Sequence, residues 1–295
     1  MKPAIQPFLN DKLLVAALLA MCLLAPIANA QNVHKDLQYA AVDGKALLLD
    51  LYLPEGVAAP PLVVWIHGGA WMRGSKDSPP SEFVEAGFAT ASVEFRQSVE
   101  ARFPAQIHDI KAAIRFLRAS AAKYGYRTDR IAISGSSSGG HLAALVGVSN
   151  GVAALEGKIG DHPGQSSAVQ AILDYYGPTN FMTILAQSTP HGLSVRVPAL
   201  ERLIGGRPEA VSELARLASP VEHVGPGDPP LLMFHGDQDP QVPINQSHEL
   251  EGAYQRAGLP VTFFVVHGAE HGGPEFFEPE PLKQALSFLR QTLKQ

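Results

Sequence analysis

Arg130-Ile-Ala-Ile-Ser-Gly135-Ser-Ser137-Ser-Gly139-Gly-His141-Leu-Ala-Ala-Leu145 is the stretch that decides the fold of this chain. An apolar run of the β type ends at Ser134, breaks at a cluster of glycines and serines, and resumes as an alanine- and leucine-rich helical pattern. The stretch therefore predicts a strand, a very tight turn and a helix. Glycines are needed at such a turn because strand and helix backbones nearly touch, and a Cβ would collide there.

The same turn distinguishes among three consecutive serines. Only Ser137 has glycine both two residues before it and two residues after it, in a G-x-S-x-G pattern. A serine in that pattern stands on a sharp bend, with its Oγ clear of the sheet and a helix N-terminus beneath it. Ser137 is therefore the candidate nucleophile. A flexible Gly/Ser turn without chemistry is the alternative that the pentapeptide alone leaves open.

Length and composition limit the classes of protein to consider. With 295 residues the chain can form one large domain or two small ones. Hydrophobic residues make up 46% of it and charged residues 17%, so it can bury a large core. The net charge of −5 gives no electrostatic footprint for nucleic acid, and we expect no nucleic-acid partner.

The first thirty residues are predicted to be a secretory signal peptide. A short polar start with Lys2 and Lys12 leads into an apolar run over 13–25, and Ala28-Asn29-Ala30 supplies the small residues of a cleavage site. The run is too short for a membrane span, and an uncleaved anchor is the alternative. We expect a periplasmic or secreted protein of residues 31–295 that is not bound to a membrane after cleavage. The single cysteine, Cys22, would leave with the leader.

Strand and helix patterns alternate along the rest of the chain. This alternation predicts an α/β fold with a mostly parallel central sheet and helices on both faces. Residues 178–228 differ, because they mix proline, glycine and short helical patterns without a strand signal, and we expect a small inserted cap there. The predicted strands cover 37–42, 46–53, 62–66, 88–95, 130–134, 169–175, 231–234 and 261–266. The predicted helices cover 78–87, 103–122, the segment after the tight turn at Ser137, 197–204, 208–217, 244–257 and 281–293.

Four candidate functional residues come just after predicted strands: His67, Ser137, Asp239 and His271. Ligands of parallel α/β sheets bind at the carboxyl ends of the strands. The agreement in position is stronger support for a common site than any of the motifs alone.

A serine nucleophile requires a base, and the base requires an acid that orients it. The loop His235-Gly-Asp-Gln-Asp239 offers two acids, and we favour Asp239 over Asp237 because Val242-Pro243 fixes the loop just after it. The last loop offers two histidines. We favour His271 over His267 because His271 lies between glycines in a segment that can reach across, whereas His267 ends the strand.

The oxyanion formed during attack by Ser137 needs preorganised N–H donors. We predict the backbone N–H groups of Gly69, Ala70 and Ser138 for this role. Trp71 and Met72 would then leave the loop within reach of the bound ester, so both are predicted to bind substrate and to favour short acyl groups. Packing of Trp71 against the sheet is the alternative.

A set of motifs, in order, resembles the α/β-hydrolase esterases related to the hormone-sensitive lipase group, and within them the feruloyl-esterase-like, BD-FAE-type branch. The motifs are His67-Gly-Gly-Ala-Trp71, Phe103-Pro-Ala-Gln-Ile-His-Asp109, Gly135-Ser-Ser-Ser-Gly-Gly-His141-Leu-Ala, Tyr176-Gly-Pro-Thr179, His235-Gly-Asp-Gln-Asp239 and Gly268-Ala-Glu-His271-Gly. The resemblance covers nearly all of residues 45–290 and implies an α/β-hydrolase fold in a single domain, with Tyr176 at the substrate pocket. The chain departs from the family pattern at Ala70, where the family has glycine, and at Phe95, where the family has tyrosine.

The sequence thus predicts a secreted serine hydrolase that cleaves carboxylic esters, short-chain or feruloyl and acetyl, through an acyl-enzyme. The substrate would be a small molecule or would be linked to a polysaccharide. An amide-cleaving relative of peptidase or arylformamidase type, and a non-catalytic binding protein on the same fold, are the alternatives. No metal or other cofactor is expected, because the histidines are scattered. Arg96 and Asp109 are expected to form a structural ion pair and His141 to be a packed helix residue. The oligomeric state is left open.

Overall fold

The computed structural model describes residues 1, 32–77 and 79–294, so the predicted signal peptide lies outside the described residues. Residues Gln31–Gln295 form one compact unit. In the described part of the chain, no helix is both long enough and apolar enough to cross a membrane.

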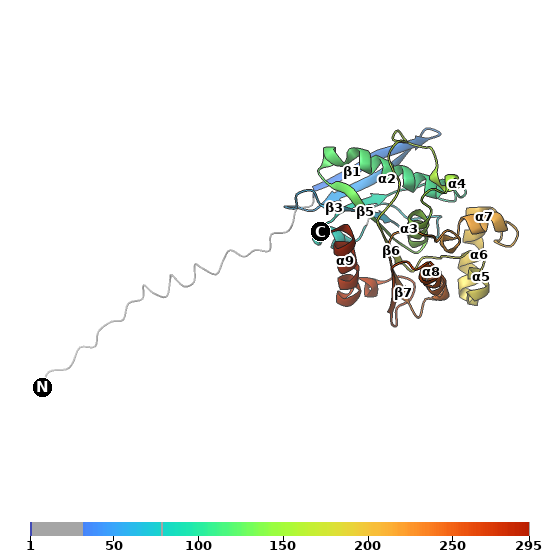
Figure 1. The fold of residues 1–295 in the computed structure, drawn as a ribbon. Helices are drawn as coiled ribbons and strands as arrows, with labels where there is room; N and C mark the ends of the chain where they lie inside the picture. The colour runs from blue at the N-terminus through green and yellow to red at the C-terminus, as the bar shows by residue number, and fades with distance from the viewer. Residues whose placement is uncertain (2–31, 78, 295) are drawn as a thin grey trace. The chain divides into compact units, whose positions relative to one another are not determined.

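One sheet of eight strands organises the described residues (Figure 1). Its strand order is β1-β2-β4-β3-β5-β6-β7-β8. Only the pairs β1–β2 and β2–β4 are antiparallel, and all strands from β4 to β8 run parallel. The strands are β1 Asn32–Val42, β2 Lys45–Leu53, β3 Pro61–Ile66, β4 Ala89–Val93, β5 Arg127–Ser136, β6 Ala171–Tyr175, β7 Leu231–Gly236 and β8 Val261–Val266. The predicted fold class is confirmed.

Both faces of the sheet are covered, which explains why its central strands are continuous apolar runs. In β3, Leu62, Val64 and Ile66 belong to one hydrophobic cluster, and Val63 and Trp65 belong to the other. The first cluster contains side chains of α2, α3 and α8, and the second contains those of α1 and α9. Figure 1 shows α2 and α9 on opposite sides of the sheet. The α-helices are α1 Ser81–Glu85, α2 Ala105–Tyr124, α3 Ser138–Val148, α4 Ala153–Glu156, α5 Ile184–Gln187, α6 Pro190–Ile204, α7 Ser212–Leu217, α8 Asn245–Arg256 and α9 Pro279–Leu293, and the 3₁₀ helices are η1 Pro220–Glu222 and η2 Pro274–Phe277.

The first strand starts five residues before its predicted start. Its pairing with β2 shifts register between His34 and Leu37 and again between Gln38 and Ala40, and Asp36 has a φ of 55°. These bulges break the alternation of apolar and polar residues that marks a strand in a sequence. The sequence pattern therefore became readable only from Leu37 onward.

The segment predicted as a cap, between β6 and β7, contains α5, α6, α7 and η1 and no strand among its described residues. Its longest helix, α6, begins at Pro190 rather than at Val197. Thr189 caps it by accepting a hydrogen bond from Gly192 N, and proline is favoured at the first helical position. Pro198 inside the helix obscured this early start in the sequence.

Candidate active site

The predicted nucleophile stands on a strained turn between β5 and α3. Ser137 has φ 53° and ψ −120°, a backbone conformation that residues other than glycine rarely adopt. A Cβ at Gly139 would lie 2.1 Å from Ile66 O, and one at Gly135 would lie 2.4 Å from Gly139 O. The two glycines therefore permit the close approach that the sequence pattern predicted. Such strain is typical of functional sites, where surrounding packing maintains it.

Three predicted residues form one hydrogen-bonded chain. Ser137 Oγ lies 2.8 Å from His271 Nε2, and His271 Nδ1 lies 2.6 Å from Asp239 Oδ2. Ser137 is 8% exposed, and the side chains of His271 and Asp239 are 10% and 0% exposed. With the carboxylate accepting from Nδ1–H, the Nε2 lone pair is free to accept the serine proton.

Asp239, in the loop after β7, accepts hydrogen bonds from backbone N–H groups and two histidines. Its Oδ1 accepts hydrogen bonds from Gln241 N at 2.8 Å and from Val242 N at 2.9 Å. Burial would raise the pKa of Asp239, but hydrogen bonds from His235 and His271 outweigh it and hold that pKa well below its usual range. Asp239 therefore stays ionised at neutral pH.

The less favoured candidates, Asp237 and His267, bind each other. Asp237 Oδ2 lies 2.9 Å from His267 Nδ1, and Asp237 Oδ1 accepts from Gly268 N at 2.8 Å. The side chain of His267 is 84% exposed. Among the described residues, neither side chain has a hydrogen bond to Ser137.

The loop predicted to supply the oxyanion donors lies against the serine turn. A Cβ at Gly68 would lie 3.0 Å from Ser136 O and 3.4 Å from Ser137 Cβ. Gly69 has a φ of 121°, and Ala70, which replaces the family glycine, has a φ of 54°. A left-handed alanine costs roughly 1 kcal/mol, so the loop keeps a conformation that its sequence disfavours. Ser138, the third predicted donor, is the first residue of α3.

Trp71 is fully enclosed rather than facing open space. It is 0% exposed, and its Nε1–H donates to His141 Nδ1 at 3.1 Å. Its ring meets those of His141 and Phe181 edge to face, at 5.2 and 5.5 Å. These contacts favour the alternative that Trp71 packs the loop. Met72 is half-buried against the same core.

His141 is a packed residue of α3, as expected. It is 0% exposed, and its Nε2–H donates to Ala218 O at 2.7 Å while its Nδ1 accepts from Trp71. Burial lowers the pKa of His141 to about 4, so the ring is neutral at physiological pH. It connects the loop after β3 with the end of the segment between β6 and β7.

Tyr176 contacts the base directly. Its ring lies 5.0 Å from that of His271 and 4.6 Å from that of Phe276. Burial raises the pKa of Tyr176 to about 12, so the phenol keeps its proton at neutral pH. It therefore adds a neutral, half-buried ring next to the imidazole.

The expected ion pair between Arg96 and Asp109 is present. Arg96 Nη2 lies 2.7 Å from Asp109 Oδ1, and Arg96 N donates to Asp109 Oδ2 at 2.8 Å. Asp109 is 0% exposed. The pair joins the segment after β4 to α2.

Sequence reasoning assigned no role to two residues that interact with Asp239, the predicted orienting acid. His235 Nε2 lies 3.2 Å from Asp239 Oδ2 and 3.0 Å from Val242 O, while its Nδ1 accepts from Ser247 Oγ at 2.7 Å. The available signal was the i, i+4 spacing of His235, in β7, and Asp239, in the loop after β7. Arg196, on α6, has Asp239 as its charge partner, and no motif marked it.

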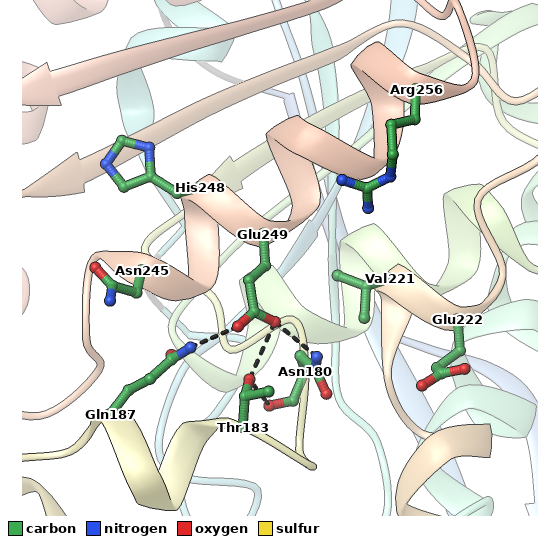
Figure 2. A pocket seen from close by; sticks show the side chains of 9 residues that line it. All are labelled: Asn180, Thr183, Gln187, Val221, Glu222, Asn245, His248, Glu249 and Arg256. Atoms are coloured by element: carbon green, nitrogen blue, oxygen red, sulfur yellow. Dashed lines mark hydrogen bonds between the residues drawn. The ribbon is translucent and has the colours of Figure 1, made fainter.

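A separate cavity of about 760 Å³ lies beside α8 (Figure 2). Glu249 accepts hydrogen bonds there from Asn180, Thr183 and Gln187, which ties α8 to the segment after β6. None of its lining residues belongs to the predicted site. Among the described residues, no three His, Cys, Asp or Glu side chains form a group that could hold a metal.

A family model and several curated relatives, among them proteins named as esterases, match this chain. The BD-FAE family model matches residues 49–254. Esterase LipC of Mycobacterium tuberculosis is 30% identical over 238 residues, which cover 78% of this chain and 58% of LipC. The chain thus spans about half the length of the curated relatives it matches.

Solved structures agree with the sequence match. A truncated carbohydrate esterase from gut microbiota has a TM-score of 0.81 and 33% identity, over 92% of this chain and 99% of that one. Propionate-bound esterase 2 of Thermogutta terrifontis has a TM-score of 0.69 and 26% identity, over 88% and 94%. With more than half of its length matched by the family model, and with an α/β-hydrolase sheet, the chain belongs to the BD-FAE family.

Proposed function

We propose that this chain is a serine hydrolase of carboxylic esters, with short acyl groups or acetyl and feruloyl groups carried by a carbohydrate or another alcohol. The observation that supports it most is the hydrogen-bonded chain from Ser137 through His271 to Asp239. The names of the relatives support the ester class, since they include esterases and a carbohydrate esterase. The propionate in a related esterase supports a small acyl group.

The proposed reaction has two halves. Ser137 Oγ attacks the carbonyl carbon while His271 Nε2 takes its proton, and the alcohol leaves with that proton. Water then loses a proton to the same nitrogen and attacks the acyl-enzyme, which releases the acid and restores Ser137. The N–H groups of Gly69, Ala70 and Ser138 stabilise the oxyanion in both halves, and one such donor typically contributes a factor of about 10²–10³ in rate.

The proposal includes export. Residues 1–30 carry the pattern of a cleavable signal peptide, so the enzyme would act in the periplasm or outside the cell. Mass spectrometry of the exported protein tests this, and a mature N-terminus at Gln31 is the expected result. A product that keeps the apolar run of residues 13–25 would contradict it.

The experiment that tests the activity follows 4-nitrophenol release from 4-nitrophenyl acetate. We expect a burst of about one equivalent per active site, and a fluorophosphonate probe should label Ser137. Ser137→Ala should lower kcat by at least about 10⁴-fold without unfolding the protein, because the variant has no nucleophile. Only the residual rate that binding and the oxyanion donors supply should remain.

Ser136→Ala is the matched control and should keep most of the activity. Loss of activity in Ser136→Ala but not in Ser137→Ala would show that Ser137 is not the nucleophile. Wild-type protein that neither turns over the ester nor takes up the probe would instead be a binding protein on this fold. Faster cleavage of the matching anilide than of the ester would favour the amide-cleaving alternative.

A further inference from the structure

Arg196 is the one charged member of the buried face of α6. The other buried residues of this helix are Gly192, Ala199, Leu200, Leu203 and Ile204. Arg196 is 1% exposed, so its guanidinium is enclosed almost as completely as the leucines. Residues 192, 196, 199, 200 and 203 follow helical spacing, so they form one inward stripe.

In the part of the chain that the structure describes, two of the three guanidinium nitrogens of Arg196 lack a hydrogen-bond partner. Among the described residues, Nε and Nη1 of Arg196 are buried and find no hydrogen-bond acceptor. Burial lowers the pKa of Arg196 and the charge of Asp239 opposes this, leaving it at about 10, so the group is charged at neutral pH. A buried cation without hydrogen bonds is costly, and an anion that reached the guanidinium would offset that cost.

The two ends of α6 locate Arg196 relative to the sheet. At the start, the Cβ position of Gly192 lies 3.1 Å from Pro240 O, in the loop after β7. At the end, Leu203 O accepts from Phe103 N at 2.9 Å, in the loop after β4. Between β7 and β4 the sheet contains β6, β5 and β3, and Ser137 directly follows β5.

The dimensions agree with a helix that crosses the carboxyl ends of these strands. The eleven helical steps from Gly192 to Leu203 measure about 17 Å. Four steps between neighbouring strands measure about 19 Å. Arg196 lies one turn, about 6 Å, beyond Gly192, so its backbone lies between the β7 end and the β5 end of the sheet. The charge of Asp239, in the loop after β7, acts on its guanidinium.

Resting on the proposed function, we propose that Arg196 is a substrate-binding residue that takes a carboxylate carried by the ester substrate beyond its scissile bond. A carboxylate offers two oxygens in a plane, which match the fork of guanidinium donors and neutralise its charge. Two kinds of ester carry such a group. The carboxylate can lie on the acyl side, as in a monoester of a dicarboxylic acid, or on the alcohol side, as in an ester of an acidic sugar or phenol.

Two pairs of substrates test both sides. The acyl pair is mono-4-nitrophenyl glutarate and its methyl ester, and the alcohol pair is 4-acetoxybenzoate and its methyl ester. For at least one pair, wild type should have the higher kcat/KM for the free carboxylate. Arg196→Gln should lower the ratio of carboxylate to methyl ester by about ten- to a hundredfold, mainly through KM, because charged hydrogen bonds contribute about 1.5–3 kcal/mol. Arg196→Lys should give an intermediate ratio.

Arg202→Gln is the matched control, because Arg202 lies on the same helix but is exposed, and it should leave both ratios unchanged. A wild type that prefers the methyl esters in both pairs would overturn the proposal. So would an equal loss on all four substrates in Arg196→Gln, since Arg196 would then act through Asp239 or the fold. If that variant does not fold, inhibition of wild type decides the same question. Competitive inhibition by glutarate or benzoate but not by their amides is expected, and equal inhibition by acids and amides would overturn the proposal. Absence of turnover of all four esters by wild type would refute the proposed function instead.

Discussion

At the scale of single residues, the loop after β7 gives two nearby acids opposite environments. Asp239 is enclosed, and it accepts hydrogen bonds from two backbone N–H groups and two histidines. Asp237 accepts from the exposed His267 and from Gly268 N. Only the first arrangement orients an imidazole toward a serine.

Asparagine substitutions at these two positions should therefore differ strongly. Asp239→Asn should lower kcat for 4-nitrophenyl acetate by about 10⁴-fold, because an amide favours the wrong tautomer of His271. Asp237→Asn should stay within about threefold of wild type, since the effect of a surface substitution is usually small. Steady-state kinetics of the two variants, with circular dichroism to check folding, measure this. A more damaging Asp237→Asn would move the acid two residues earlier.

The sequence could indicate Ser137 because its glycine register reflects a steric requirement. It could favour Asp239 and His271 because the loops around them carry proline or glycine. It could not indicate Arg196, because no local pattern marks a buried cation and Asp239, whose charge acts on it, is distant in sequence. The burial of Trp71 was hidden for the same reason, since Phe181 and His141 surround it only in the folded chain.

At the scale of elements, the indole of Trp71 joins three segments. Its hydrogen bond reaches α3 through His141, and His141 in turn binds Ala218 O after α7. The loop that carries the predicted oxyanion donors is thus fixed to α3 and to the segment between β6 and β7.

Trp71→Ala should lower the free energy of unfolding by about 3–5 kcal/mol, the usual cost of removing a buried large aromatic side chain. The rates on acetate, butyrate and decanoate esters should fall together, so the chain-length profile should stay the same. Urea unfolding and a 4-nitrophenyl ester series on this variant measure both effects. A profile that shifts toward decanoate at unchanged stability would restore the pocket-wall role predicted from the sequence.

At the scale of the whole molecule, the sequence predicted the sheet well because burial on both faces makes β3 a continuous apolar run and places Ile131-Ala-Ile133 in the middle of β5. It predicted the starts of β1 and α6 poorly, because a bulge and an internal proline interrupt the periodic pattern. The stability of the sheet also depends on a group that no pattern marked. Asp174, on β6, is 0% exposed, and its Oδ1 accepts from Gly177 N at 2.9 Å.

Burial raises the pKa of Asp174 from 3.8 to about 7, although the N–H of Gly177 opposes this. The folded state favours the protonated form of Asp174. The contribution of this carboxyl to the free energy of unfolding is therefore complete below about pH 4 and is lost as pH rises through about 7. As pH rises from 5 to 8.5, deprotonation of Asp174 should lower the free energy of unfolding by about 2 to 3 kcal/mol.

Asp174→Asn keeps the oxygen acceptor for Gly177 N and should flatten this decline. Urea unfolding of both proteins at pH 5 and pH 8.5 provides the comparison. Equal declines in wild type and variant would mean that Asp174 titrates no differently in the folded and unfolded chains.

The irregular pairing of β1 has a consequence for how copies of the protein meet. A sheet edge with a regular row of free N–H and C=O groups invites a strand of another molecule to extend it, which is a route to aggregation. The two register shifts of β1 and the left-handed Asp36 interrupt that row. The side chain of Lys35 places a charge at the same point, beside Asp50. A second copy approaching this edge therefore meets a bent strand whose row of backbone groups is interrupted, an arrangement that disfavours edge-to-edge pairing.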